Sequence, residues 1–279
     1  MRLQSLLFAV ACASCTQSLD LDRFHKTGAT EEPLSNVTYY DLRFTARSMQ
    51  SHIDEYLELR IVDKSNAVQA KAIYTGITLP DFVMQMNRIV PKSNPPYRID
   101  MWADHNRSKK YDGIEGGVND KDHAWRRMLA DPFPEDVHLA GRRYDFDFLH
   151  DTSFVDIYTD LQGNRISGED TLLPFTLQVK GANPQKAVEV RVYDRASTRM
   201  VGLYRHGRPT GDFAAQITGV LDEVTDYHVA IFVDENGDGL AGPGDPSWNL
   251  DITSSTAGLE ANIDLGSATR SPIEMDVNP

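Results

Sequence analysis

Oxygen-bearing side chains recur at alternate positions in one short segment, DENGDGLAGPGD, residues 234–245. Counted from its first residue, they stand at positions 1, 3, 5 and 12, with a glycine at position 6 (Asp234, Asn236, Asp238, Asp245 and Gly239). Calcium takes six to eight oxygen ligands at about 2.4 Å, and a tight turn directs alternate side chains towards one centre. The backbone carbonyl of Leu240, at position 7, would add a further ligand. The spacing predicts a Ca²⁺ site formed by Asp234, Asn236, Asp238, Leu240 and Asp245.

The segment resembles the calcium loop of EF-hand proteins, D-x-[DN]-x-[DN]-G-x5-E. It departs from that pattern because Asp245 replaces the final Glu, and because the following Gly-Pro-Gly would break an exiting helix. The preceding residues, YHVAIFV, favour a strand. The resemblance therefore implies ion binding on a β-hairpin and no more. A plain polar turn is the alternative, since Asn-Gly and Asp-Gly are favoured turn pairs.

Charge supports the calcium interpretation. No Lys or Arg occurs from Pro209 to Thr269, whereas acids are frequent there, and a divalent cation would relieve their mutual repulsion. The whole chain carries a formal net charge of -13 over 279 residues. Such a surface repels phosphate backbones, so nucleic acid is excluded as an expected partner.

Both cysteines lie in the first fifteen residues, MRLQSLLFAVACASC. One early cation, a short apolar run and small residues before Cys indicate a secretory signal over residues 1–15. The segment resembles a bacterial lipoprotein signal, which implies lipidation of Cys15, with Cys12 as the other frame; an ordinary signal peptide is the alternative. Residues 16–36 are polar and are expected to form a flexible tether. The resemblance implies a lipid-anchored protein of the cell envelope, at the outer membrane or cell surface, or else a secreted one.

The elements that position the acidic loop belong to an internal duplication. Sliding the chain on itself by 131 residues aligns LRFT with LPFT and LELRIVD with VEVRVYD; small gaps then align PYRIDMWADHN with DYHVAIFVDEN and Trp125 with Trp248. We expect one β-sandwich domain at 37–160, a linker at 161–171 and a second sandwich at 172–279.

Each copy reads as about seven short strands separated by turn signals, which predicts an all-β protein of two tandem Greek-key β-sandwich domains. Immunoglobulin-like and transthyretin-like topologies both fit. Residues 81–90 and 212–220 alone resemble helical turns. The duplicated pairs Glu58/Arg60 and Glu189/Arg191 alternate with apolar residues, so they are expected on a solvent face. Trp125 and Trp248 are expected to pack under the loops that precede them, with a stacked sugar ring as the alternative, and Trp102 is expected in the core.

The first copy keeps Asp104 and Asn106 of the loop but has Ser108 in place of Asp238 and adds several lysines. We expect this loop not to bind calcium and a Lys109 or Lys110 ammonium to stand in place of the ion. His105 and His123 accompany Asp104, Asp120 and Asp122 there, so transition-metal binding is conceivable, but their spacing fits no standard ligand pattern. The simpler expectation is exposed loop histidines.

No catalytic motif was recognised in the chain. The sequence therefore predicts a non-catalytic cell-envelope lipoprotein that binds Ca²⁺ in its second domain and presents a surface to an unknown protein or glycan ligand. Two alternatives stay open: a carbohydrate-binding or adhesion module, which would show rows of exposed aromatic residues, and an envelope enzyme with its site at the domain interface.

Overall fold

A computed structural model describes residues 38–92, 96–114, 121–129, 143–167, 170–183, 185–242 and 244–271. All described residues belong to one compact unit, which falls within Pro33–Pro279. In this part of the chain the regular elements are β-strands and one 3-10 helix, η3 (Gln50–His52), which confirms the all-β prediction. The expected signal, the tether and Cys15 lie outside the described residues.

The strands fall into two sets of seven with the same order. The first half contains β1 (Tyr39–Arg47), β2 (Tyr56–Val62), β3 (Val68–Thr75), β4 (Phe82–Pro91), β5 (Arg98–Ala103), β6 (His123–Met128) and β7 (Arg143–Leu149). The second half contains β8 (Leu173–Lys180), β9 (Val188–Asp194), β10 (Met200–His206), β11 (Phe213–Leu221), β12 (Asp226–Val233), β13 (Ser247–Thr253) and β14 (Leu259–Asp264). Residues 81–90 and 212–220, which resembled helical turns, thus supply β4 and β11.

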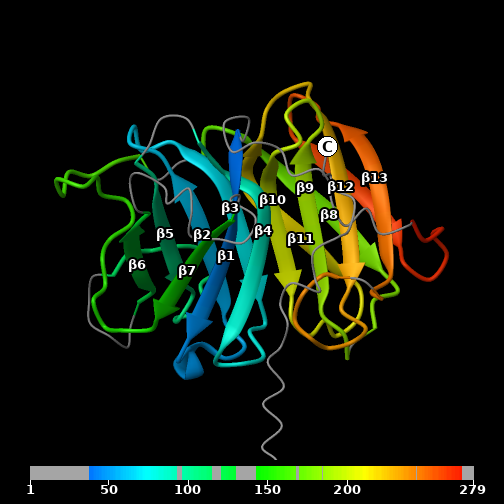
Figure 1. Ribbon diagram of the computed structural model, residues 1–279, viewed down its shortest axis with the longest axis horizontal. Coiled ribbons are helices and arrows are strands. Elements are labelled where there is room, and N and C mark those ends of the chain that lie inside the picture. The colour runs from blue at the N-terminus through cyan, green and yellow to red at the C-terminus, as the bar shows by residue number, and fades with distance from the viewer. Residues whose placement is uncertain are drawn as a thin grey trace, which may run out of the picture. The chain divides into compact units, whose positions relative to one another are not determined.

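Each half folds as a sandwich of two sheets. The first, fourth and seventh strands form a small sheet, with orders β4-β1-β7 and β11-β8-β14, in which the outer pairs β1–β7 and β8–β14 are parallel. The other four strands of each half belong to one eight-stranded sheet of order β13-β12-β9-β10-β3-β2-β5-β6 (Figure 1). An immunoglobulin constant domain instead groups strands A, B, E and D against C, F and G.

Contacts outside the strands repeat as well, which supports the predicted duplication. The Asp81 carboxylate accepts a hydrogen bond from the Ser48 amide at 2.8 Å, and Asp212 does the same for Gly181 at 3.0 Å. Trp125 and Trp248 are both buried, and each indole N–H donates to a backbone carbonyl. The same kinds of local hydrogen bond therefore recur in corresponding parts of both copies, as a duplication predicts.

The two halves join through β3 and β10, which pair in parallel with Ala72 opposite Leu203 and Ile73 opposite Tyr204. β3 and β10 are equivalent strands of the two copies, and they lie parallel in one sheet. The small sheet of the first half therefore packs on one face of the shared sheet, and the small sheet of the second half packs on the opposite face. Ala72 and Leu203 accordingly pack into the first core, whereas Ile73 and Tyr204 pack into the second. Each core therefore takes residues from both halves.

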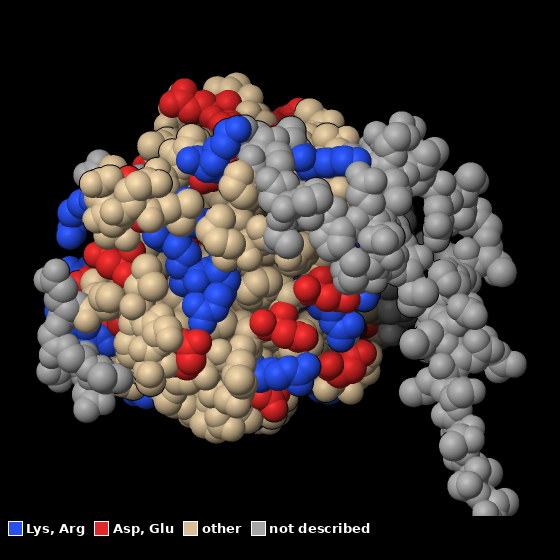
Figure 2. All heavy atoms as spheres, turned by 60° about the vertical axis from the view of Figure 1, so that its left-hand side comes forward, with Lys and Arg blue, Asp and Glu red and all other residues tan. Residues whose placement is uncertain are grey.

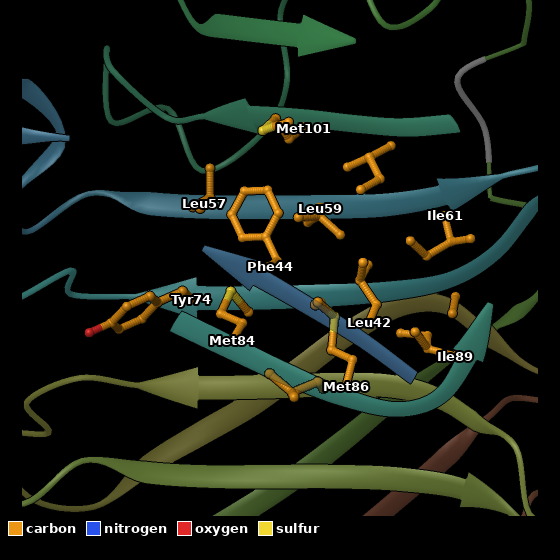
Figure 3. Packing of buried hydrophobic residues seen from close by; sticks show 14 of the residues in the cluster. Leu42, Phe44, Leu57, Leu59, Ile61, Tyr74, Met84, Met86, Ile89 and Met101 are labelled. Atoms are coloured by element: carbon orange, nitrogen blue, oxygen red, sulfur yellow. The ribbon is translucent and has the colours of Figure 1, made fainter. Parts of the chain in front are cut away.

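The first core is centred on Phe44 of β1, which lies over Leu57 and Leu59 of β2 (Figure 3). Its ring also stacks on the β7 rings of Phe146 and Phe148, with centroids 6.0 Å and 6.2 Å apart. All of the apolar side chains that the figure labels are buried in one cluster, at about 1.5–3 kcal/mol for each large one. This packing holds β1 and β4 across the shared sheet.

The expectation of a solvent face for the duplicated Glu and Arg pairs is wrong, because all four residues are buried. In the first half, Arg60 donates to Glu58 at 2.5 Å, and the Lys71 ammonium lies 3.9 Å from the same carboxylate. The face that carries them is covered by the chain after β7. Lys71 is bound to Asp170 at 2.6 Å in that segment, and the Arg60 guanidinium lies over the ring of Tyr158.

The second half repeats the arrangement on the other face of the shared sheet. Arg191 donates to Glu189 at 2.6 Å and lies over the ring of Phe232. Arg205 of β10 takes the place of Lys71 as the additional cation, 3.9 Å from Glu189. Alternation indicated correctly that these side chains point away from their own core, but it did not show that other segments cover the opposite face.

The buried Glu58 makes folding sensitive to acid. Burial alone would raise its pKa, but Arg60 and Lys71 outweigh burial and lower the pKa to about 2. Since this pKa lies below its value in the unfolded chain, the stabilisation is complete above about pH 5 and is lost as the pH falls towards 2.

We expect Glu58→Gln to destabilise the protein by about 3–5 kcal/mol at pH 7, because the buried Arg60 loses its carboxylate partner and Lys71 keeps only the carboxylate of Asp170. The variant should also lack the roughly 3 kcal/mol of stability that Glu58 contributes and that the wild type loses between pH 5 and pH 2. Urea unfolding across this pH range measures both effects, with the exposed Glu260→Gln as the matched control. Equal acid sensitivity in wild type and Glu58→Gln would contradict the assignment.

Candidate metal sites

The acidic loop after β12 folds back on its own backbone. Asp234 accepts the amides of Gly237 and Gly239 at 2.7 Å and 3.0 Å, and Asp238 accepts that of Leu240 at 2.8 Å. The Asn236 amide nitrogen donates to the Asp238 carboxylate at 3.0 Å. The side chains at positions 1, 3 and 5 are thus brought around one tight turn.

Asp245, the last expected ligand, ties the two ends of the loop together. It is buried, and its two oxygens accept the amides of Glu235 at 3.0 Å and Gly242 at 2.8 Å. The loop is also less isolated from positive charge than the sequence suggested. Arg205 lies 3.6 Å from Asp234 and donates to the Gly239 carbonyl, and Lys186 donates to the Glu235 carbonyl at 2.5 Å. These cations come from β10 and from the turn before β9, outside the stretch that lacks Lys and Arg.

The equivalent loop of the first half has the same framework. Asp104 is buried and accepts the amides of Ser108 and Lys109, each at 2.9 Å. Asp122 occupies the place of Asp245: it is buried, and one of its oxygens accepts the Asp112 amide at 3.0 Å. Burial, with the carboxylates of Asp112 and Asp104 nearby, raises the pKa of Asp122 to about 7.

The expected substitution of a lysine ammonium for the ion is not observed. Lys109 and Lys110 are exposed, and among the described residues no ion pair joins either of them to Asp104 or Asp122. Backbone amides hold both oxygens of Asp104 and one oxygen of Asp122, whereas the second oxygen of Asp122 is buried without a hydrogen-bond partner in the described structure.

A different cluster gathers four of the eight histidines at one end of the first half. His52 ends η3, His105 follows β5, His123 begins β6 and His150 follows β7. His52 Nε2 lies 3.1 Å from His150 Nε2 and 3.3 Å from His123 Nδ1. The expectation of exposed loop histidines is wrong for His123, which is buried, as is His52.

Glu55, just before β2, links the cluster together. One of its oxygens lies 2.6 Å from His52 Nδ1 and the other 3.0 Å from His105 Nδ1. The carboxylate is buried, so both contacts are shielded from water. Two groups here have the geometry of a metal site, one of His52, His123 and His150 and one of His52, Glu55 and His105.

Aromatic packing fixes the imidazole rings. His123 is stacked between His105 and Phe154, with both centroids at 4.3 Å. The ring of Trp125 stands edge-on to His52 at 5.6 Å and to His150 at 5.4 Å. Burial, and then the neighbouring His52 and His123, lower the pKa of His150.

A cavity of about 580 Å³ lies beside this cluster, where the two halves meet. Glu55, Tyr56 and Asp104 line it from the first half, and Tyr204, His206 and Gln216 from the second. Glu55 therefore borders both the cavity and the histidines.

Comparisons with known proteins give only distant likeness. No protein-family model and no curated sequence matches the chain. The tip fimbrial protein Mfa3 from Porphyromonas gingivalis, with a C-terminal truncation, is 9% identical with a TM-score of 0.25, over 77% of this chain and 81% of that one. The shaft pilin spaA from Lactobacillus rhamnosus GG, a D295N mutant, is 9% identical with a TM-score of 0.21, over 81% and 97%. Scores this low do not establish a shared fold, so these proteins say nothing about function here.

For the first-half loop we expect Asp104→Ala to destabilise the protein by about 1–3 kcal/mol, since the amides of Ser108 and Lys109 both lose the buried carboxylate that accepts them. Lys109→Ala and Lys110→Ala should change stability by less than about 0.5 kcal/mol, as exposed side chains do. Chemical denaturation of the three variants measures the difference. A large loss in either lysine variant would show that an ammonium does stabilise the loop.

Proposed function

We propose that the protein is a non-catalytic component of the cell envelope that presents its paired sandwiches as a binding or structural surface. The observation that carries the proposal is the eight-stranded sheet, which runs through both halves and makes them one continuous body. Such a body offers a broad surface built from two copies of one design. In this proposal the N-terminal segment directs the protein to the envelope: a lipid on Cys15 anchors it, and residues 16–36 form the tether.

The surface suits recognition of a protein or a glycan. Basic and acidic side chains lie interspersed among uncharged ones on the face that Figure 2 presents. The cavity where the halves meet offers the rings of Tyr56 and Tyr204 beside the polar groups of Gln216 and Thr218, a combination suited to a glycan. In the described residues, no helix is long and apolar enough to cross a membrane.

We further propose that Asp234, Asn236, Asp238, Asp245 and the Leu240 carbonyl bind Ca²⁺ in the second half. The hydrogen bonds that gather the first three side chains around one turn support this arrangement. An ion there would stabilise the loop against the repulsion among its carboxylates.

Thermal unfolding with a chelator, and then with millimolar Ca²⁺, tests the calcium proposal. Calcium at about 100 times its dissociation constant should add roughly 2.7 kcal/mol, a rise of several degrees in Tm. Asp238→Ala should abolish the rise, because Asp238 is an expected calcium ligand. The variant should still fold, because the Asp238 side chain is exposed and is not part of a core. The matched control is Ser108→Ala at the equivalent position of the first half, which should keep it. No rise in the wild type would refute the proposal.

Lipidation is tested by expressing the full chain in a bacterium supplied with a labelled fatty acid. Label should enter the wild type, and Cys15→Ser should lose both the label and its recovery with membranes. Cys12→Ser is the matched control and should retain both. Loss of label in Cys12→Ser alone would move the lipid to Cys12, and no label in the wild type would refute the anchor.

A further inference from the structure

Three imidazole nitrogens converge in the histidine cluster at distances suited to a metal ion. His52 Nε2 is 3.1 Å from His150 Nε2 and 3.3 Å from His123 Nδ1, and one ring nitrogen from each of the three residues lies within 4.8 Å of the others. Two nitrogens bound at about 2.05 Å to a tetrahedral zinc ion are themselves about 3.3 Å apart. We infer that His52, His123 and His150 form a binding site for a transition-metal ion, with zinc as the best fit. This site lies in the first half, separate from the proposed calcium loop.

Hydrogen bonding among the rings does not account for the geometry. A neutral imidazole carries one N–H and one lone pair. The Nδ1 atom of His52 is already paired with the buried Glu55 carboxylate at 2.6 Å, so its proton is placed there. Only the single lone pair on Nε2 remains to face both His123 and His150. One lone pair makes one good hydrogen bond, whereas a metal ion lets all three nitrogens act as ligands.

Glu55 has the position of a group that orients a metal ligand. Histidines that bind metals usually donate their other ring N–H to a carboxylate, which fixes the tautomer and makes the ligating nitrogen more basic. Glu55 does this for His52, while its second oxygen faces His105 at 3.0 Å. His105 in turn stacks on the ring of His123. Glu55 is therefore linked to two of the proposed ligands, directly to His52 and through His105 to His123.

The duplication provides an internal control. In the second half, Asn183, Glu235 and Pro246 occupy the places of His52, His105 and His123, and Lys186 occupies that of Glu55. Glu55 contacts His105 in the first half, and the equivalent pair in the second half is an ion pair between Lys186 and Glu235. Because the sandwich is built there without imidazoles, the fold does not require the histidine cluster.

The environment favours a borderline metal with access from solvent. Three imidazoles suit zinc, copper or nickel ions better than calcium or magnesium, which prefer oxygen. His52 and His123 are buried, but His150 is only half-buried, so an ion can enter from its side. Three histidine ligands leave a fourth position of a tetrahedral ion for another ligand.

Cobalt(II) is a visible probe for this site, because tetrahedral coordination gives intense absorption bands. We expect the purified, metal-stripped protein to bind one equivalent of Co²⁺ with such bands and to release it to Zn²⁺ but not to Ca²⁺. His150→Ala should weaken cobalt binding by more than about 100-fold, and Glu55→Gln by about 10–100-fold. His228→Ala is the matched control, since His228 pairs with Asp251 on β12 and β13, and it should bind as the wild type does.

A measurement on the wild type alone keeps the test decisive if a variant fails to fold. Bound zinc should protect His52, His123 and His150 from carbethoxylation, read by mass spectrometry, and should leave His228 reactive. Cobalt binding that survives in His150→Ala, or zinc that protects none of the three histidines, would overturn the inference. Asp238→Ala should leave cobalt binding unchanged, so this result is independent of the calcium proposal.

Discussion

The hydrogen bonds between β3 and β10 are the contact on which the rest of this structure depends. Without them each four-stranded sheet would end in an unpaired edge strand, a site for uncontrolled association. Pairing the two edges removes both at once. Because the paired strands are equivalent and parallel, their residues alternate between the two cores: Ala72 and Leu203 enter the first, Ile73 and Tyr204 the second. Neither core is complete within its own half.

The same pairing explains why charged residues are buried. In an isolated sandwich the outer face of each sheet is exposed to water. Here each face of the shared sheet is covered by a small sheet along one half of its width. Over the other half of each face lie irregular segments. The chain after β7 covers Glu58 and Arg60, and the acidic loop brings Leu240 and Ala241 against Glu189 and Arg205. Buried carboxylates need buried cations, so each Glu has two.

Local sequence signals predicted the strands well, because alternation and turn residues act over a few positions. The duplication followed from aligned words such as LELRIVD and VEVRVYD. The sequence did not indicate which strands meet across the two copies. One signal was present: β3 and β10 have adjacent apolar residues, Ala72-Ile73 and Leu203-Tyr204, as a strand covered on both faces requires. Alternation of Glu58 and Arg60 was interpreted as solvent exposure because covering segments are non-local.

The full histidine cluster was missed for the same reason, since its members come from positions 52, 105, 123 and 150 and are brought together by η3 and by the ends of β5, β6 and β7. Spacing along the chain carries no information about such a set. Comparison of the two copies is informative, because residues present in both are candidates for a role in folding, whereas residues present in one copy are candidates for a separate role. Asp104 and Asp234, or Asp122 and Asp245, recur in both halves and organise their loops. The imidazoles occur at this place in one half only, beside a carboxylate whose counterpart is Lys186, so selection for folding alone does not explain them.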